Sequence, residues 1–413
     1  MMSYGRMFTI AASAAAGLLA GFGAQAQTTL HLFTGNPDGK FPEARPLFVP
    51  GSPDNFIYGT TDSGGTHGQG VVWKYDLTTS AESVVHAFRP FPLDGGQPLA
   101  GLIQHGNFLY GTTSVGGTNG LGTVYRVNVS TGHEHVLYSF AGNPDGQAPM
   151  AGLLYEGGYL YGTTAAGGSS NLGTVFQCTL SGACSVICNF TGGPDGSTPY
   201  GGLIFLKVPG ATPPQALFGT TQRGGSAGFG TVFALPLPPP PADIVLHSFA
   251  GAPDGAYPEA ELVADGPYIY STTYQGGGTG CAGSGCGTVF RIMPSGTGYA
   301  KIYSFGGYAG PPTFDAANPE AGLTVDGGLL YGTSFQGGSA GTCSSGPNVV
   351  GCGTVFRMTQ TGTGEAVIVD FKDTTNGLWP VAGLILNSGV LYGTTDAGEA
   401  VPNNNQGTLF SIP

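Results

Sequence analysis

Charged residues are scarce in this sequence. Asp, Glu, Lys and Arg together make 9% of the 413 residues, and only 12 of them are Lys or Arg. With a formal net charge of −12, the chain lacks the basic patches that nucleic acids and anionic membranes require. We expect neither as a partner; cations and neutral polymers such as glycans fit better. Disorder combines high charge with low hydrophobicity, and it is excluded because 40% of the residues are hydrophobic.

The usual signatures of catalysis are missing as well. No Gly-x-Ser-x-Gly motif lies between a strand and a helix, and there is no phosphate-binding loop. The seven His and seven Cys do not show the paired spacings of a zinc site. We therefore expect no cofactor, with Ca²⁺ as an alternative that no motif supports.

A long apolar run occurs only at the N-terminus. Arg6 precedes a mostly apolar stretch over residues 7–23, and residues 24–26 (Ala-Gln-Ala) fit a cleavage site. A membrane anchor is the alternative, but Ser and Gly interrupt the stretch, which is short for a span. We expect residues 1–26 to be a signal peptide and the mature chain to be secreted, extracellular or periplasmic. We also expect that it does not insert into a membrane and that no anchoring tail follows Phe410.

Glycine and proline, by contrast, are abundant, at 76 and 31 residues. Each Gly in a helix interior costs about 1 kcal/mol relative to Ala, which excludes a helical fold. The 24 Phe and 19 Tyr provide the side chains of a large core. The composition predicts an all-β chain dense in turns.

Two short units alternate seven times along the chain. The first is Tyr-Gly-Thr-Thr or a variant, beginning at Tyr58, Tyr110, Tyr161, Phe218, Tyr270, Tyr331 and Tyr392. The second is Gly-Thr-Val-Phe or a variant, beginning at Gly70, Gly122, Gly173, Gly230, Gly287, Gly353 and Gly407. Each repeat contains four strand-like pieces, which in the third copy are 151–155, 159–164, 173–179 and 185–190. Seven such repeats predict a seven-bladed β-propeller of four-stranded blades.

The phase of the repeats predicts how the ring closes. The last repeat stops after its third strand near Ile412, and a strand of the fourth type, Thr29–Phe33, stands at the start of the mature chain. We expect this N-terminal strand to complete the last blade. Residues 27–413 then form one seven-repeat domain, which we expect to be a monomer. A β-solenoid would need a shorter and more uniform period.

The succession Leu-Tyr-Gly-Thr-Thr, Gly-Gly and Gly-Thr-Val-Phe resembles the tandem "GloVer" repeat of exported bacterial proteins with variable "choice-of-anchor" C-termini. The resemblance covers nearly all of residues 28–412. It implies export and a propeller-like repeat, and it assigns no catalytic residues.

Seven cysteines fit an oxidising compartment. We expect the disulfides Cys281–Cys286, Cys343–Cys352 and Cys178–Cys188. The first two each close one loop, in equivalent positions of successive repeats. The third joins neighbouring strands of a hairpin that also contains Cys184, and one thiol is left over.

A Pro-Asp-Gly turn or a variant precedes the first strand of several repeats. Its acidic residues are Asp38, Asp94, Asp145, Asp195 and Asp254. In a propeller these turns share one face with the Gly-Gly loops, which predicts a ring of carboxylates for cations or sugar hydroxyls. The alternative is structural, because Pro sets φ, Asp bonds its own backbone and Gly takes the left-handed position.

Departures from the repeat gather on the same face in blades five to seven, where loops 276–287 and 337–353 are extended. Insertions on one face are typical of a binding surface, and variation in surface loops is the alternative. The candidate ligand-binding residues, aromatic rings for stacking and polar groups for hydrogen bonds, are Tyr274, Asp315, Glu320, Phe335, Trp379, Glu399 and Asn404.

Three functions fit this sequence. The first is an exported, non-catalytic binding module whose looped face near blades five to seven contacts an extracellular glycan or protein. The second is a polysaccharide-active hydrolase or lyase with a carboxylate couple at the channel mouth. The third is a structural surface component.

Overall fold

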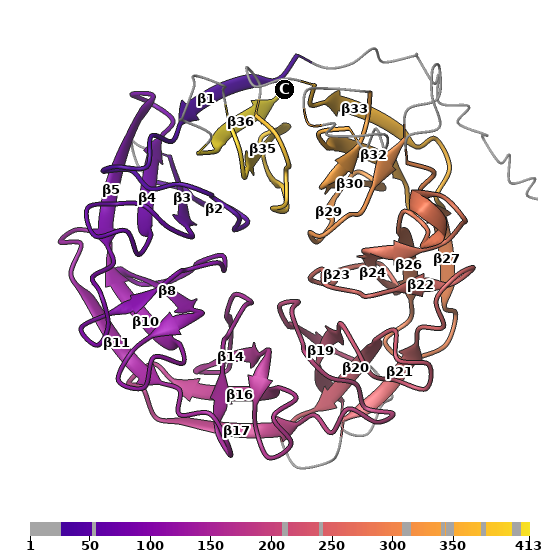
Figure 1. The fold of residues 1–413 in the computed structure, drawn as a ribbon, viewed down its shortest axis with the longest axis horizontal. Coiled ribbons are helices and arrows are strands. Elements are labelled where there is room, and N and C mark those ends of the chain that lie inside the picture. The colour runs from indigo at the N-terminus through magenta and orange to yellow at the C-terminus, as the bar shows by residue number, and fades with distance from the viewer. Residues whose placement is uncertain are drawn as a thin grey trace, which may run out of the picture.

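A computed structural model describes residues 26–51, 55–208, 214–238, 243–307, 315–339, 343, 351–372, 377–398 and 406–413. Seven four-stranded antiparallel sheets surround a central axis as the blades of a propeller (Figure 1). The expected seven-bladed β-propeller is therefore confirmed. Within the described ranges, the one helical element is the 3-10 turn Cys281–Gly283. No helix of these ranges is long and apolar enough to cross a membrane.

Each blade runs from an inner strand near the axis to an outer strand at the rim (Figure 1). Blade 1 contains β2 (Leu47–Val49), β3 (Phe56–Thr61), β4 (Val71–Asp76) and β5 (Ala81–Ala87). Blade 2 contains β7 (Ile103–His105), β8 (Phe108–Thr113), β10 (Thr123–Asn128) and β11 (Glu134–Ser139). Blade 3 contains β13 (Leu154–Glu156), β14 (Tyr159–Thr164), β16 (Thr174–Thr179) and β17 (Cys184–Asn189). Blade 4 contains β18 (Ile204–Lys207), β19 (Gln215–Thr221), β20 (Thr231–Pro236) and β21 (Ile244–Ser248).

Blade 5 contains β23 (Val263–Asp265), β24 (Tyr268–Thr273), β26 (Thr288–Ile292) and β27 (Ala300–Ser304). Blade 6 contains β29 (Thr324–Asp326), β30 (Leu329–Ser334), β32 (Thr354–Thr359) and β33 (Ala366–Asp370). Blade 7 contains β34 (Ile385–Asn387), β35 (Val390–Thr395), β36 (Thr408–Ile412) and β1 (Thr28–Leu32).

The N-terminal strand closes the ring, as the phase of the repeats predicts. Strand β1 pairs antiparallel with β36, with Thr28 opposite Ser411 and Leu32 opposite Thr408. The two ends of the colour scale meet in this blade in Figure 1. Directly after β1, Phe33 is buried and its ring lies 5.5 Å from that of Trp73 in blade 1. The closing strand is thus anchored to the blades on both sides of the seam.

Four short two-stranded ladders show that two kinds of loop lie on one face. Each ladder pairs the loop before an inner strand with the loop between the second and third strands of the same blade. The ladders are β6 (Gly95–Gly96) with β9 (Val115–Gly116), β12 (Gly146–Gln147) with β15 (Ala166–Gly167), β22 (Gly255–Ala256) with β25 (Gln275–Gly276), and β28 (Ala316–Ala317) with β31 (Gln336–Gly337). We call the face that carries these ladders the looped face.

The repeated Thr pairs hold the blades together. Thr112 Oγ1 donates to the carbonyl of Ala151 in the next blade at 2.9 Å. Thr113 Oγ1 lies 2.8 Å from Thr123 Oγ1 within its own blade. The cores lie between blades, where Phe140 and Phe176 meet edge to face at 5.1 Å. The Thr and Phe residues of the repeat therefore have a structural role in packing and hydrogen bonding, which explains why they recur from blade to blade.

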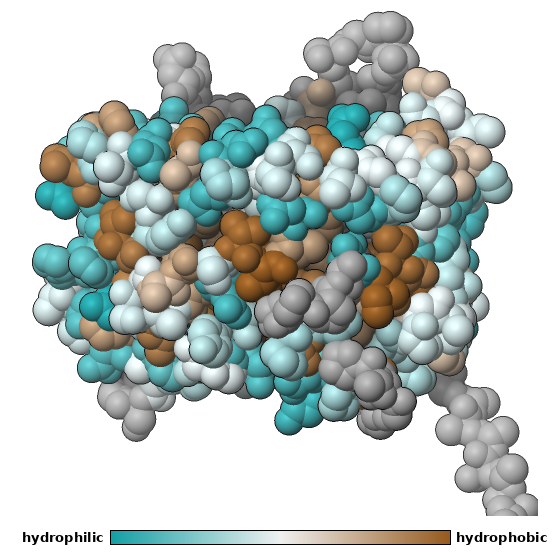
Figure 2. All heavy atoms as spheres, turned by 90° about the horizontal axis from the view of Figure 1, so that it is seen from below, coloured by the Kyte–Doolittle hydropathy of each residue, from teal (hydrophilic) through white to brown (hydrophobic). Residues whose placement is uncertain are grey.

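The outer wall of the ring is mixed in character. Seen edge-on, this side shows hydrophobic groups separated by hydrophilic ones rather than one continuous patch (Figure 2). Among the outer strands, Ile244 at the start of β21 is 52% exposed.

The structure confirms two of the expected disulfides and corrects the third. Cys281–Cys286 and Cys343–Cys352 form as expected. Cys178, however, pairs with Cys184 and not with Cys188. The reason is register: the short hairpin between β16 and β17 puts Cys184 opposite Cys178, whereas Cys188 lies opposite Val175.

Candidate site at the mouth of the central cavity

A cavity of about 430 Å³ lies on the axis of the ring and is lined by all seven blades. Its walls are the Pro-x-Ala or Pro-x-Gly segments that lead into the inner strands. The x residues, in blade order, are Glu43, Leu99, Met150, Tyr200, Glu259, Glu320 and Val381. At this position of the repeat, blades 1, 5 and 6 therefore contribute a carboxyl group to the wall, and the other four blades contribute an uncharged side chain.

Five carboxyl groups form what we call the acidic mouth: Glu43, Glu259 and Glu320 from the cavity wall, and Asp62 and Asp396, which follow the Thr-Thr units of blades 1 and 7. Burial, with Glu259, Glu43 and Asp396 nearby, raises the pKa of Glu320 to about 8. Burial together with Asp396 and Asp62 raises the pKa of Glu43 to about 7, and burial together with Asp62 raises that of Asp396 to about 6. At neutral pH the mouth thus offers both hydrogen-bond donors and acceptors.

An unusual backbone conformation shapes the rim of the mouth. The residue before the Pro of every blade has a φ between 52° and 59°; these are Phe41, Gln97, Ala148, Thr198, Tyr257, Asn318 and Trp379. Such values are uncommon for non-glycine residues. Two backbone hydrogen bonds hold each of them: the Trp379 N–H donates to Cys352 O at 2.9 Å, and Trp379 O accepts from the Asp396 N–H at 3.0 Å. The fold thereby fixes a ring of side chains around the opening.

Aromatic rings accompany the carboxylates on one side of this rim. The rings of Phe335 and Trp379 lie 6.0 Å apart with an interplanar angle of 39°. Tyr274 lies near the acidic mouth. Burial, together with the charges of Glu320 and Glu259, raises the pKa of its hydroxyl group. The structure thus brings four of the predicted residues together in two pairs, Phe335 with Trp379 and Tyr274 with Glu320.

Of the other three predicted ligand-binding residues, the structure describes Asp315, which is not part of this group. Asp315 lies at the junction of blades 5 and 6, where its Oδ2 accepts from the Gly306 N–H at 2.6 Å and from the Tyr303 hydroxyl at 3.2 Å. Glu399 and Asn404 lie outside the described residues.

The predicted ring of turn carboxylates does not line the mouth. Each Asp lies at a junction between blades and accepts from the backbone N–H that follows the last Phe of an outer strand. The pairs are Thr34–Asp38 (3.1 Å), Arg89–Asp94 (2.9 Å), Ala141–Asp145 (2.9 Å), Thr191–Asp195 (2.7 Å) and Ala250–Asp254 (3.1 Å). This geometry fits the structural alternative, in which each Asp holds its own turn.

Sequence reasoning missed Glu43, Asp62, Glu259 and Asp396. A signal was present: aligned against each other, the repeats carry apolar or neutral residues at these positions in most blades and acidic ones in blades 1, 5, 6 and 7. The acidic mouth is therefore indicated by residues that differ from the repeat consensus within the regular segments of the repeat as well as in its loops.

The Gloeobacter/Verrucomicrobia repeat matches residues 48–282, 210–343 and 282–413. The chain belongs to this family. Membership accounts for the repeats, and it confirms the resemblance seen in the repeat units. No curated protein matches the chain.

Solved structures share the fold at low identity. A proposed 6-phosphogluconolactonase from Bacteroides uniformis is 15% identical over 82% of this chain and 88% of its own, with a TM-score of 0.50. The extracellular domain of a proposed hybrid two-component system from B. thetaiotaomicron is 12% identical over 93% of this chain and 39% of its own, with a TM-score of 0.55. An oligogalacturonate lyase from Vibrio parahaemolyticus is 10% identical over 94% of this chain and 95% of its own, with a TM-score of 0.50. At such identities the likeness extends to the fold alone.

Proposed function

We propose that this protein is an exported carbohydrate-binding module whose site is the acidic mouth with its aromatic rim. The observation that carries the proposal is the pair of rings Phe335 and Trp379, 6.0 Å apart on the rim, together with Tyr274, which lies near Glu320 of the cavity wall. Aromatic faces stack on the apolar faces of sugar rings, and mixed donors and acceptors match their hydroxyl groups.

Charge narrows the class of glycan. The five carboxyl groups of the mouth and the net charge of −12 repel uronic-acid polymers. Neutral polysaccharides and those that carry amino groups suit the site. A polymer is favoured because the rim lies on an open face of the ring, so that a chain can extend beyond the residues it contacts.

Thermal unfolding of residues 27–413 against a panel of polysaccharides tests this proposal. A ligand that binds only the folded chain raises the melting temperature by mass action. We expect a rise with a neutral β-glucan or with chito-oligosaccharides, and none with polygalacturonate. Trp379→Ala removes the rise, whereas Phe91→Ala, at a ring that is 56% exposed and away from the mouth, retains it. A panel without any shift, or an equal response of the two variants, would overturn the proposal.

A second function, a glycan-cleaving enzyme, is favoured by one observation. Burial and acidic neighbours raise the pKa of Glu320 to about 8, so that a protonated carboxyl stands beside ionised ones at neutral pH, as glycosidases require. Reducing ends released in the same mixtures distinguish the two. In an enzyme, Glu320→Gln abolishes product formation while the thermal shift persists; in a binding module, no product forms with either chain.

A further inference from the structure

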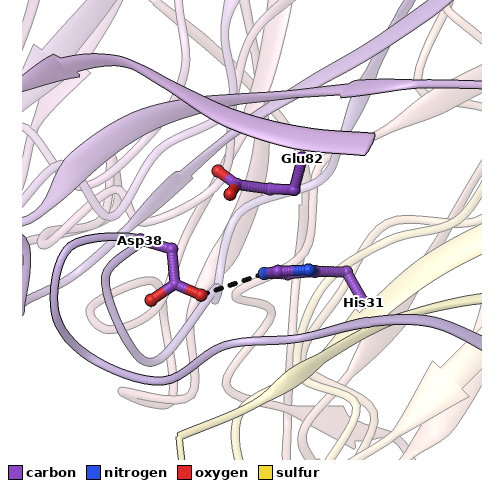
Figure 3. A group of neighbouring side chains, drawn as sticks. All are labelled: His31, Asp38 and Glu82. Carbon is purple, nitrogen blue, oxygen red and sulfur yellow. Dashed lines mark hydrogen bonds and ion pairs between the residues drawn. The ribbon is translucent and has the colours of Figure 1, made fainter. Parts of the chain in front are cut away.

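Away from the mouth, three side chains that can ligate a metal converge at the seam between blades 7 and 1. His31 lies on β1, Asp38 in the following turn and Glu82 on β5, the outer strand of blade 1. Figure 3 shows the Glu82 carboxylate above the pair formed by His31 and Asp38. His31 Nε2 lies 3.0 Å from Asp38 Oδ2, and one ligand atom from each of the three residues lies within 4.8 Å of the others.

One of these groups is incompletely paired. Glu82 Oε1 is buried without a hydrogen-bond partner among the described residues. Asp38 is satisfied by different means, since Thr34 donates to it from both its N–H and its hydroxyl, the latter at 2.6 Å. The cluster therefore contains a buried carboxyl oxygen, Glu82 Oε1, that receives no hydrogen bond from the described residues.

The junction between blades 1 and 2 contains an equivalent cluster with an arginine beside its carboxylate. His86, Asp94 and Glu134 repeat the same three positions between blades 1 and 2. There, Arg89 lies against the carboxylate, with Nε 3.1 Å from Asp94 Oδ2 and Nη2 3.3 Å from Asp94 Oδ1. The residue at the equivalent position of the first cluster is the neutral Thr34. A built-in cation thus lies against the Asp of the second cluster and is missing from the first, while the Glu of each cluster, Glu82 and Glu134, has a buried Oε1 without a hydrogen-bond partner among the described residues.

The remaining described junctions lack the His-Asp-Glu combination and use other donors. Tyr138 donates to Asp145 at 2.9 Å, and Tyr303 donates to Asp315 at 3.2 Å. At the junction of blades 4 and 5, Asp254 accepts from Tyr299 and lies 3.1 Å from His247 Nε2. Hydroxyl groups complete these sites without added charge.

We propose that His31, Asp38 and Glu82 bind a divalent transition-metal cation that clamps the N-terminal strand to blade 1. An imidazole nitrogen with two carboxylates is a ligand set for Zn²⁺ or Mn²⁺, which bind nitrogen and oxygen at about 2.0–2.2 Å. Ca²⁺ prefers six to eight oxygens, which this cluster does not supply. On binding, His31 Nε2 gives up its proton to solvent and binds the metal together with Asp38 and Glu82; Nδ1 carries the proton of the neutral imidazole, retained from a protonated ring or taken up from solvent.

Calorimetric titration of the metal-free chain with ZnCl₂, and separately with MnCl₂ and CaCl₂, tests the proposal. We expect one Zn²⁺ site per chain, weaker or no binding of Ca²⁺, and a melting temperature that rises with Zn²⁺ and returns on chelation. Glu82→Gln has the same shape as Glu82 and removes no hydrogen bond, so it abolishes the site while the chain still folds. Glu134→Gln, the matched change in the second cluster, leaves Zn²⁺ binding intact.

Exchanging the residue that differs between the two clusters gives a sharper test. Thr34→Arg places a guanidinium in the first cluster and abolishes Zn²⁺ binding. Arg89→Thr frees the second cluster and raises the stoichiometry from one to two. Absence of Zn²⁺ binding by the unmodified chain overturns the proposal. Zn²⁺ binding by the Glu82→Gln and Thr34→Arg chains that equals binding by the unmodified chain also overturns it, because the metal then binds elsewhere on the surface. Circular dichroism verifies that each variant is folded.

Discussion

The guanidinium of Arg45 in blade 1 lies 3.7 Å from the carboxylate of Glu261 in blade 5 (Nη1 to Oε2), on the opposite side of the central cavity. Arg45 Nε also donates to Leu384 O of blade 7 at 3.0 Å, and its Nη2 to Thr324 Oγ1 of blade 6 at 3.4 Å. One side chain therefore joins four blades along the axis, two residues beyond Glu43 of the acidic mouth.

Replacing Arg45 by Met is expected to lower the free energy of unfolding by about 1–2 kcal/mol, because hydrogen bonds from a charged group are lost while the half-exposed ion pair adds little. Urea unfolding followed by fluorescence measures the difference. Lys207→Met, at an exposed position on β18, is the control and should change stability by less than about 0.5 kcal/mol. Equal effects of the two changes would contradict the bridging role of Arg45.

Ring closure depends on Phe33 more than on its neighbour. Phe33 is 3% exposed and packs against blade 1, whereas Leu32 is 39% exposed. Truncating a buried Phe to Ala costs about 3–5 kcal/mol, and an exposed Leu changes little. In thermal melts, Phe33→Ala and the deletion of residues 27–33 should each lower the melting temperature strongly. Leu32→Ala should lower it only slightly. An unchanged melting temperature on deletion would refute closure by this strand.

Stability should fall as the pH rises from about 4.5 to about 8. In the folded chain the pKa of Glu320 is raised to about 8 and that of Glu43 to about 7. The folded state therefore retains protons that the unfolded state, with ordinary carboxyl pKa values, has already released. Asp254, with a pKa of about 2, acts below this window and in the opposite sense, since its contribution is lost as the pH falls.

Urea unfolding at several pH values with constant salt measures whether the free energy of unfolding falls as the pH rises. Glu320→Gln is expected to flatten the decline, so that this variant gains stability relative to the parent at high pH. Asp76→Asn serves as the control, because a hydrogen bond from the Thr78 backbone lowers the pKa of Asp76 and it titrates below the window. A parallel decline in the Glu320→Gln chain would contradict the raised pKa.

Cys188 should be inert in the folded protein. Burial, together with Asp243 and Asp195, raises the pKa of its thiol to about 12, and the thiolate is the reactive form. Alkylation at pH 8 should label it only after unfolding. Peptide mapping of the labelled protein also checks the pairing, which should link Cys178 to Cys184. Rapid labelling in native buffer, or a peptide that links Cys178 to Cys188, would refute this assignment.

Most features of the fold could be predicted from the local sequence pattern. Strand positions, the number of blades and the completion of blade 7 by β1 follow from units such as Tyr392-Gly-Thr-Thr and from the phase of the repeat at each end. Such features depend on residues that lie close in the chain, and each blade repeats them. The Pro-Asp-Gly turns are similar, because Asp145 and the Ala141 N–H that it accepts from are four residues apart.

The candidate sites depend on contacts between distant repeats. Nothing in the sequence places Glu43 beside Asp396, or Glu82 beside His31; these neighbours appear only when the ring closes and juxtaposes its first and last blades. The pairing of Cys178 was likewise decided by cross-strand register rather than by spacing. Each repeat contains its own short-range hydrogen bonds and buried strand residues, whereas the distances between repeats are set by the packing of seven blades around one axis. The sequence alone therefore determined the propeller, and the tertiary structure decided which side chains meet.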